Sequence, residues 1–218
     1  EAYFDQEIAG IRGRGNTTWA NSDKKPYQIK LNKKADILQD GQKTKTWLLI
    51  ANAADPTLLR NTISFNLANY LGVDGTPSCE PCDLYYNGEY RGSYLITEKV
   101  KVEKNGVNID DLDDANAAVN EGSDSLANPY AHMKWAVNDR GEKFSYVEGL
   151  NNPGNITGGY LVELDDKASG ELSTFYAGGH YFTLHTPEIA TYDEVKYISE
   201  LFADALAAAH AGGEDPAT

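Results

Sequence analysis

Residues 82–100, CDLYYNGEYRGSYLITEKV, constrain the fold more than any other stretch of the chain. Two β-rich runs lie on either side of the dipeptide Asn87-Gly88. Asn-Gly favours the positive φ angles of a tight turn whose twist matches that of two antiparallel strands. We therefore predict a β-hairpin here, and with it a sheet that is mainly antiparallel.

Further strands are predicted from local patterns. Residues 26–31 (PYQIKL) alternate between apolar and polar side chains, and residues 45–51 (KTWLLIA) have the composition of a buried strand. Residues 158–164 (GGYLVEL) form another apolar run, and we expect residues 181–184 to pair nearby.

Two helices are predicted. The first covers residues 56–71, with Asp55 as N-cap, Pro56 in the first turn and Gly72 just after the last turn. Its apolar face, which we expect to pack on the sheet, comprises Leu58, Leu59, Ile63, Leu67 and Leu71. The second covers residues 192–210, and its apolar face comprises Val195, Ile198, Leu201, Phe202, Ala205 and Leu206. Together these elements predict an α+β fold, a mainly antiparallel sheet with packed helices.

The length of 218 residues fits a single domain over residues 1–218. The net charge of −14, from 33 acidic and 19 basic residues, argues against unaided binding to nucleic acid or to anionic membranes. No run approaches the ~18 apolar residues that a membrane-spanning helix needs. Because the chain begins with EAYFDQ rather than Met, we expect a segment upstream of it. The tyrosine-rich, acidic composition favours an exported bacterial protein.

Residues 105–149 differ from the rest, because their first half is acidic and poor in large apolar residues. We interpret them as an excursion within the domain, with short helical or irregular pieces. Four aspartates lie there close together, but without the spacing or the central glycine of an EF-hand: Asp110, Asp111, Asp113 and Asp114. A calcium site is therefore not predicted.

The only two cysteines, Cys79 and Cys82, form a single C-x-x-C pair. A structural zinc site would need two further ligands, and the four histidines lie far away in sequence. A redox pair would be expected at the start of a helix, whereas β-rich sequence follows here. Two plain strand cysteines or a short local disulfide both fit the pattern.

Residues 11–30, IRGRGNTTWANSDKKPYQIK, concentrate cations, glycines and hydroxyl groups in a short segment that leads into a strand. Backbone N–H groups, hydroxyls, guanidinium and ammonium groups can converge on phosphate oxygens. The alternative is a β-hairpin whose glycines serve the turn and whose charges are solvated. The segment matches neither the GxGxxG pattern nor a Walker loop.

Five blocks of sequence, in this order, resemble the CotH family: RGNTTW, KKPYQIKL, LLIANAADPTLLRN, LYYNGEYRGSYLITE and GGYLVELDD. The family comprises atypical protein kinases that are similar to spore coat protein H and are also found in secreted bacterial proteins. The resemblance covers essentially the whole chain. It implies a divergent protein-kinase-like α+β fold that binds ATP with Mg²⁺ or Mn²⁺ and phosphorylates Ser or Thr of coat or secreted proteins.

The resemblance also implies four cofactor contacts. Arg14, in RGNTTW, resembles the phosphate-facing arginine of the family's opening loop, and Lys25 resembles the strand lysine that holds the nucleotide phosphates. Arg60, followed by Asn61, matches the family's Arg-Asn pair after the Asp-Pro block. Glu98 matches the acidic residue that closes the hairpin strand. We expect Arg14, Lys25 and Glu98 to line one cleft. The ammonium group of Lys25 should lie within ion-pair distance of Glu98 or of a bound anion.

Asp165 matches the aspartate that ends the later strand of the family and is the implied metal ligand. Such a set suits phosphoryl transfer, which depends on positioning and charge stabilisation by cations, a Lys–Glu pair and metal-binding carboxylates. In the family the catalytic acidic residues lie further downstream, in an Asn-x-Asp block and a Trp-Asp-x-Asp block. Neither block follows the predicted helix of residues 192–210 in this chain. We therefore expect the C-terminal part of the module to be a partner of this chain, and no phosphoryl transfer by the chain alone.

Each candidate also has a structural alternative. Arg14 and Lys25 would pair with local carboxylates, Arg60 would bridge to Asp55, and Glu98 would lie solvated on its strand. Asp165 and the aspartate after it would be turn formers. The two tryptophans at positions 19 and 47 are predicted to lie in the core rather than to stack on a base.

Two further functions compete with the kinase-like reading. One is a non-catalytic structural or binding module of a spore coat or of a secreted multi-module protein. The other is carbohydrate binding, prompted by the content of Trp and Tyr, although these aromatic residues do not form a repeated stacking platform in the sequence.

Overall fold

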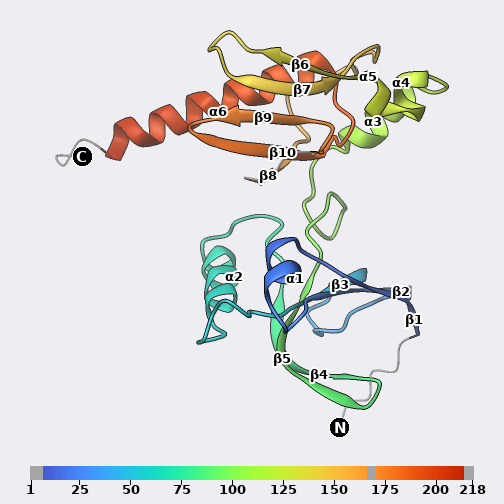
Figure 1. Cartoon of the computed structure of the whole chain (residues 1–218), viewed down its shortest axis with the longest axis vertical. Helices are drawn as coiled ribbons and strands as arrows, with labels where there is room; N and C mark the ends of the chain where they lie inside the picture. The colour runs from blue at the N-terminus through green and yellow to red at the C-terminus, as the bar shows by residue number, and fades with distance from the viewer. Residues whose placement is uncertain (1–6, 166–169, 214–218) are drawn as a thin grey trace. The chain divides into compact units, whose positions relative to one another are not determined.

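The structure is a computed structural model that describes residues 7–165 and 170–213 (Figure 1). The chain divides into two compact units, Glu1–Asn108 and Ile109–Thr218, and each is described by itself. The prediction of one domain over residues 1–218 is not tested by this division and stays a prediction.

The first unit is built on a five-stranded sheet with the strand order β1-β2-β3-β5-β4. Every neighbouring pair in it is antiparallel. The strands are β1 (Ile8–Gly13), β2 (Tyr27–Ala35), β3 (Thr44–Ile50), β4 (Cys79–Tyr86) and β5 (Glu89–Glu98). The short helix α1 (Thr17–Asn21) connects β1 to β2, and α2 (Arg60–Tyr70) connects β3 to β4.

The predicted hairpin is confirmed. β4 and β5 pair over their whole length, and Asn87 and Gly88 form the turn with φ angles of 52° and 82°. Two positive φ angles are what a type I′ turn requires, and few residues other than Asn and Gly adopt them readily. Next to the hairpin, Trp47 and Leu49 of β3 and Tyr94 of β5 are almost fully buried on one face of the sheet.

The first predicted helix is present but shorter and more exposed than expected. It starts at Arg60 rather than at Pro56, because Leu58 has a φ of 59° and cannot be helical. It ends as predicted: Gly72 has a φ of 70°, and the N–H groups of Gly72 and Val73 donate to the carbonyls of Asn69 and Ala68 in a Schellman motif.

The predicted apolar face of α2 is largely exposed, although the helix itself contacts β4 of the sheet. No residue of α2 is buried, and the five side chains of the predicted face are between 38 % and 66 % exposed: Leu58, Leu59, Ile63, Leu67 and Leu71. Helical spacing defines a face, but it does not say whether anything in the fold covers that face.

The second unit contains a second five-stranded sheet, with the strand order β6-β7-β9-β10-β8 and antiparallel pairing throughout. Its strands are β6 (Met133–Val137), β7 (Lys143–Val147), β8 (Leu161–Leu164), β9 (Thr174–Ala177) and β10 (His180–Thr186). Its helices are α3 (Leu112–Val119), α4 (Asp124–Ala127), α5 (Pro129–His132) and α6 (Tyr192–Gly213). Two antiparallel sheets with helices confirm the α+β class, although the sequence indicated one sheet.

The long helix α6 runs along one face of the second sheet, as Figure 1 shows, and contacts β7 and β9. Phe144, Phe175 and Phe182 of the sheet pack there against Ile198 of the helix. The helix is confirmed, but its buried face differs from the predicted one. Leu201 is 49 % exposed and Ala205 is also exposed, whereas the predicted list omitted the buried Ala203.

Within residues 105–149 the expected short helical pieces occur in the first half only, and the interpretation as an excursion stays a prediction. The acidic stretch forms the short helices α3 to α5, as expected. Residues 133–147, however, form β6 and β7, two neighbouring strands of the second sheet rather than irregular structure. The apolar and polar side chains of KFSYV supply the strand pattern that the acidic composition of the neighbouring residues obscured.

Cys79 and Cys82 are both free and lie on β4, which confirms the reading as plain strand cysteines. Residues three apart on a strand point to opposite faces of the sheet, so a disulfide between them is not formed. Burial raises the pKa of both thiols, which makes them poor nucleophiles. Over the described ranges, no helix combines the length and apolar character that crossing a bilayer would require.

Candidate functional site

The glycine-containing segment between β1 and β2 folds into a compact corner around Trp19. The N–H of Arg14 donates to the carbonyl of Pro26 at 3.2 Å, which closes the segment into a loop that contains α1. The indole ring of Trp19 lies directly on Gly13, where a Cβ atom would come within 2.4 Å of the ring. Glycine is therefore required at position 13 by the close approach of the ring.

Lys25 is fixed at this corner. Its ammonium group donates to the carbonyl of Trp19 at 2.6 Å and lies 5.6 Å from the centre of the Trp19 ring. An ammonium group has three donors, so this bond leaves donor capacity for a ligand. Trp19 is 42 % exposed, so the prediction that it lies in the core is wrong, whereas Trp47 is fully buried as predicted.

The neighbouring Lys24 was not selected by the sequence analysis. Its ammonium group donates to the carbonyl of Ser93 and lies 4.8 Å from the centre of the Tyr94 ring, and burial lowers the pKa of Lys24. The hydroxyl of Tyr94 in turn donates to the carbonyl of Lys25 at 2.9 Å. Lys24 and Tyr94 thus fasten the start of β2 to β5. The sequence alone does not show which of Lys24 and Lys25 is the more buried, because the alternating pattern of the strand begins only at Tyr27.

Arg60 takes part in the structure of the loop before α2. Its backbone N–H donates to the carboxylate of Asp55 at 2.9 Å, and its guanidinium group lies 3.7 Å from the same carboxylate. The hydroxyl of Thr57 donates to Asp55 as well and is the main reason why the pKa of this carboxyl lies below its ordinary value. The structural alternative for Arg60, a bridge to Asp55, is therefore present in the structure.

Asn61 also stabilises this loop. Its amide donates to the side-chain oxygen of Asn52 at 2.6 Å. The amide of Asn52 donates to the carbonyl of Leu58 at 3.3 Å, and both Asn52 and Leu58 have a positive φ. The Arg-Asn pair thus holds an unusual backbone in place at the start of α2.

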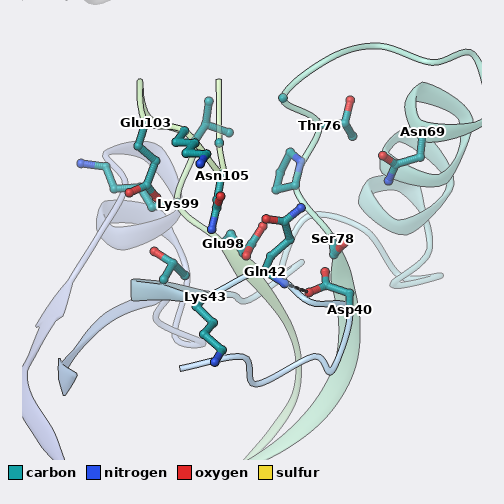
Figure 2. A pocket seen from close by; sticks show the side chains of 16 residues that line it. Asp40, Gln42, Lys43, Asn69, Thr76, Ser78, Glu98, Lys99, Glu103 and Asn105 are labelled. Carbon is teal, nitrogen blue, oxygen red and sulfur yellow. Dashed lines mark hydrogen bonds between the residues drawn. The ribbon is translucent and has the colours of Figure 1, made fainter. Parts of the chain in front are cut away.

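Glu98 lies in a polar pocket of the first unit with a volume of about 290 Å³ (Figure 2). Segments from the loop before β3, the end of α2, the loop before β4 and the chain after β5 surround it. Figure 2 shows the carboxylate of Glu98 among these side chains, with Asp40 accepting a hydrogen bond from the backbone N–H of Gln42 at 2.9 Å. Three lysines line the same pocket: Lys43, Lys99 and Lys104.

The environment of Glu98 favours its protonated form. Burial raises the pKa of Glu98 to about 7, and the negative charge of Asp40 adds to the effect, while a hydrogen bond from the backbone of Ser78 opposes it. Near neutral pH this carboxyl therefore exchanges between its neutral and charged forms. A group with such a pKa can respond to a ligand that brings charge into the pocket.

The structure does not bring Lys25 and Glu98 together. Tyr27, Leu49 and Ile96 lie in one row across the sheet, with Lys25 two residues before this row and Glu98 two residues after it. Because β2 and β5 run in the same direction, Lys25 and Glu98 are four residues apart along the strands, which corresponds to a separation of about 13 Å in that direction. No ion pair joins the two among the described side chains, and neither Lys25 nor Arg14 lines the pocket of Glu98.

Asp165 follows β8 in the second unit, where its N–H donates to the carbonyl of Tyr181 at 3.0 Å. The expected pairing of residues 181–184 with this strand is confirmed by the β8–β10 ladder. The aspartate after Asp165 lies outside the described residues. Asp165 belongs to the second unit, whereas the other four candidates belong to the first: Arg14, Lys25, Arg60 and Glu98.

Comparison with known protein families shows which family this chain belongs to. A family model described as CotH kinase protein matches residues 11–203, which is most of the chain. The chain belongs to the CotH kinase family. A comparison with curated proteins gives no match. The family assignment makes the chain a kinase-like module, and the matched range includes the Trp19 corner, the Glu98 pocket and both sheets.

Membership of a kinase family implies ATP and a divalent metal ion, and the described residues can be compared with that requirement. They contain no cluster of three or more His, Cys, Asp or Glu side chains arranged to hold a metal ion. Mg²⁺, however, is usually held by one or two carboxylates together with substrate phosphates and water. The carboxylates of Glu98 and Asp165 are donors of the type that such a metal–nucleotide complex takes from a protein.

Proposed function

We propose that this CotH-family chain binds ATP with Mg²⁺ or Mn²⁺ as a kinase-like module. The observation that carries the proposal is the family match over residues 11–203, together with the fixed position of Lys25 inside the matched range. An exposed indole, an ammonium group with spare donors and the backbone of a glycine-containing loop meet at that corner. These are groups that bind phosphates and stack on bases.

In this proposal Arg14 and Lys25 contact the nucleotide phosphates. Arg60 is the weaker candidate, because its guanidinium group is already close to Asp55. Glu98 and Asp165 are the carboxylates proposed to contact the metal ion or the ligand that carries it. Charge stabilisation by cations and metal is the main contribution that a protein makes to phosphoryl transfer. We assign no catalytic base within this chain.

The proposed acceptors are Ser or Thr residues of spore coat or secreted proteins, and the proposed location is a bacterial spore coat or the cell exterior. Both follow from the family and not from a contact in this chain. The competing function is a non-catalytic structural or binding module in the same setting. ATP binding separates the two, because a purely structural module has no reason to discriminate ATP from other polyanions.

Substitution of Lys25 by alanine tests the proposal. A hydrogen bond that involves a charged group contributes about 1.5–3 kcal/mol. Loss of the ammonium group should therefore weaken ATP binding about 10- to 150-fold. Calorimetric titration of the purified chain with ATP and Mg²⁺ measures this change. Lys33→Ala, which removes an exposed lysine from β2, the strand that follows Lys25, is the matched control.

Equal affinity of Lys25→Ala and Lys33→Ala for ATP would contradict the assignment of Lys25. An unmodified chain that binds ATP no better than it binds inorganic triphosphate would favour the non-catalytic module instead. Circular dichroism of each variant shows whether a loss of binding reflects a loss of folding.

A further inference from the structure

A buried carboxyl group lies at the start of α6. In the sequence it is far from the residues that are proposed to bind the nucleotide phosphates. Thr191 and Glu194 form a capping box there: the N–H of Glu194 donates to the Thr191 hydroxyl at 3.2 Å, and the N–H of Thr191 donates to Oε2 of Glu194 at 2.8 Å. The side chain of Glu194 is fully buried, with an exposed fraction of 0 %. Glutamate at this position of a capping box ordinarily lies at the surface, so its burial needs an explanation.

Two atoms in this region have no hydrogen-bond partner among the residues that the structure describes. Asn116 of α3 donates from Nδ2 to Oε2 of Glu194 at 2.9 Å and to the carbonyl of Ile189 at 3.2 Å. The second oxygen of each group, Oε1 of Glu194 and Oδ1 of Asn116, is buried and unpaired. Both oxygens are acceptors, so an ionised Glu194 cannot satisfy either of them.

The charges that face Glu194 do not compensate a buried anion. Asp113 of α3 carries the same sign of charge, and Tyr160 directs its hydroxyl to the carbonyls of Ile156 and Glu194 at 2.7 and 3.4 Å rather than to the carboxylate. No Lys, Arg or His forms an ion pair with Glu194 among the described residues. Hydrogen bonds from Thr191 and from the side chain of Asn116 favour the charged form, but burial is the largest influence and raises the pKa of Glu194.

We propose that Glu194 is protonated on Oε1 and donates this proton to Oδ1 of Asn116. The carboxyl group and the carboxamide then form a ring of two hydrogen bonds, one already present from Nδ2 to Oε2 and one supplied by the proton. A single proton thereby satisfies both unpaired oxygens. The pair joins α3 to α6, two helices that are distant in sequence.

This arrangement makes the contact between α3 and α6 sensitive to pH. The folded chain holds a proton that the unfolded chain releases above a pKa of about 4.5, so the folded state is favoured at low pH. The stabilisation is fully present below pH 4.5 and is lost as the pH rises through the pKa of the folded state. The opening equilibrium of the two helices changes about tenfold for each unit of difference between the two pKa values.

Glu194→Gln tests the proposal, because a neutral carboxamide can donate from Nε2 to Oδ1 of Asn116 at every pH. Hydrogen exchange of α3 and α6, corrected for the intrinsic pH dependence of exchange, reports their opening equilibrium between pH 5 and pH 8. We expect protection to fall with pH in the unmodified chain and to stay constant in Glu194→Gln. A local readout is needed because Glu98, in the first unit, titrates in the same range.

The matched control is Glu200→Gln, which removes a carboxylate from the same helix where it pairs with Lys196 at 3.8 Å. This variant should retain the pH dependence of the unmodified chain. Protection of α3 and α6 that does not fall with pH in the unmodified chain would overturn the proposal, whether or not Glu194→Gln folds. The same pH dependence in Glu194→Gln and in the unmodified chain would overturn it as well, because the pH dependence would then come from another group.

Discussion

Individual side chains of the first unit show how the Trp19 corner is held. Lys24 and Tyr94 connect the start of β2 to β5, and neither contact involves a pair of opposite charges. Lys25 is held from both sides, because its carbonyl accepts from Tyr94 while its ammonium group donates to Trp19. The residue proposed to contact phosphate is therefore positioned by uncharged neighbours, which leaves its charge available to a ligand.

Tyr94→Phe should destabilise the first unit without changing its packing. The substitution removes one hydrogen bond and leaves the partly buried carbonyl of Lys25 without that partner, so we expect the free energy of unfolding to fall by about 1–2 kcal/mol. Urea unfolding measures the change. The control is Tyr90→Phe on the same strand, where the hydroxyl bonds to Asp83 at the surface and little change is expected. Equal effects of the two substitutions would contradict the fastening role of Tyr94.

At the scale of elements, turns and helix ends follow local chemistry. Asn87-Gly88 forms the hairpin turn, and Gly72 ends α2 in a Schellman motif. The start of α2 depends on contacts that span several residues, because the carboxylate of Asp55 accepts from the N–H groups of Thr57 and Arg60 across a residue with positive φ. This loop moves the helix start four residues past the predicted Pro56.

Gly88→Ala tests the turn. Position 88 has a φ of 82°, and a residue with a Cβ atom is destabilised in such a conformation by about 1–2 kcal/mol. We expect a loss of this size in the free energy of unfolding, measured by urea titration. Gly10→Ala is the matched control in the same sheet, because Gly10 has no positive φ and a Cβ atom there would meet no neighbour within 4 Å. A loss in Gly10→Ala as large as in Gly88→Ala would mean that the turn geometry is not the cause.

At the scale of the whole molecule, the chain builds two antiparallel sheets with separate apolar cores. The core of the second unit is the larger, and α6 covers it with Val195 and Ile198. The burial of α6 contrasts with the exposure of α2, although both helices have apolar residues at helical spacing. Packing on a sheet, rather than helix pattern, therefore distinguishes the two helices.

Ile198→Ala and Leu201→Ala form a matched pair on α6. Both residues belong to the predicted apolar face, but Ile198 is 4 % exposed and Leu201 is 49 % exposed. Removal of a buried Ile side chain costs about 2–5 kcal/mol, whereas a surface change usually stays within about 0.5 kcal/mol. Urea unfolding should show this difference, and hydrogen exchange should place the loss of protection in residues 109–213. Similar losses for the two variants would contradict the buried face described for α6.

The sequence by itself predicted the features that depend on neighbouring residues. The hairpin at Asn87-Gly88, the end of α2 at Gly72, the strands near residues 26–31 and 45–51 and the long helix α6 were all indicated by patterns within about twenty residues. The ordered blocks of residues also indicated the family, and the match over residues 11–203 confirms it. These features could be predicted because turn chemistry and side-chain periodicity act locally.

Only the tertiary structure decided which residues meet. The register of three strands separates Lys25 from Glu98, and the fold exposes the apolar face of α2 while it buries Glu194 beside Asn116, 78 residues away in the chain. The Thr191–Glu194 spacing was a local signal that predicts the capping box, but not its burial. Burial and charge environment depend on segments that are distant in sequence, so no local pattern determines the pKa of a carboxyl group or the partner of a lysine.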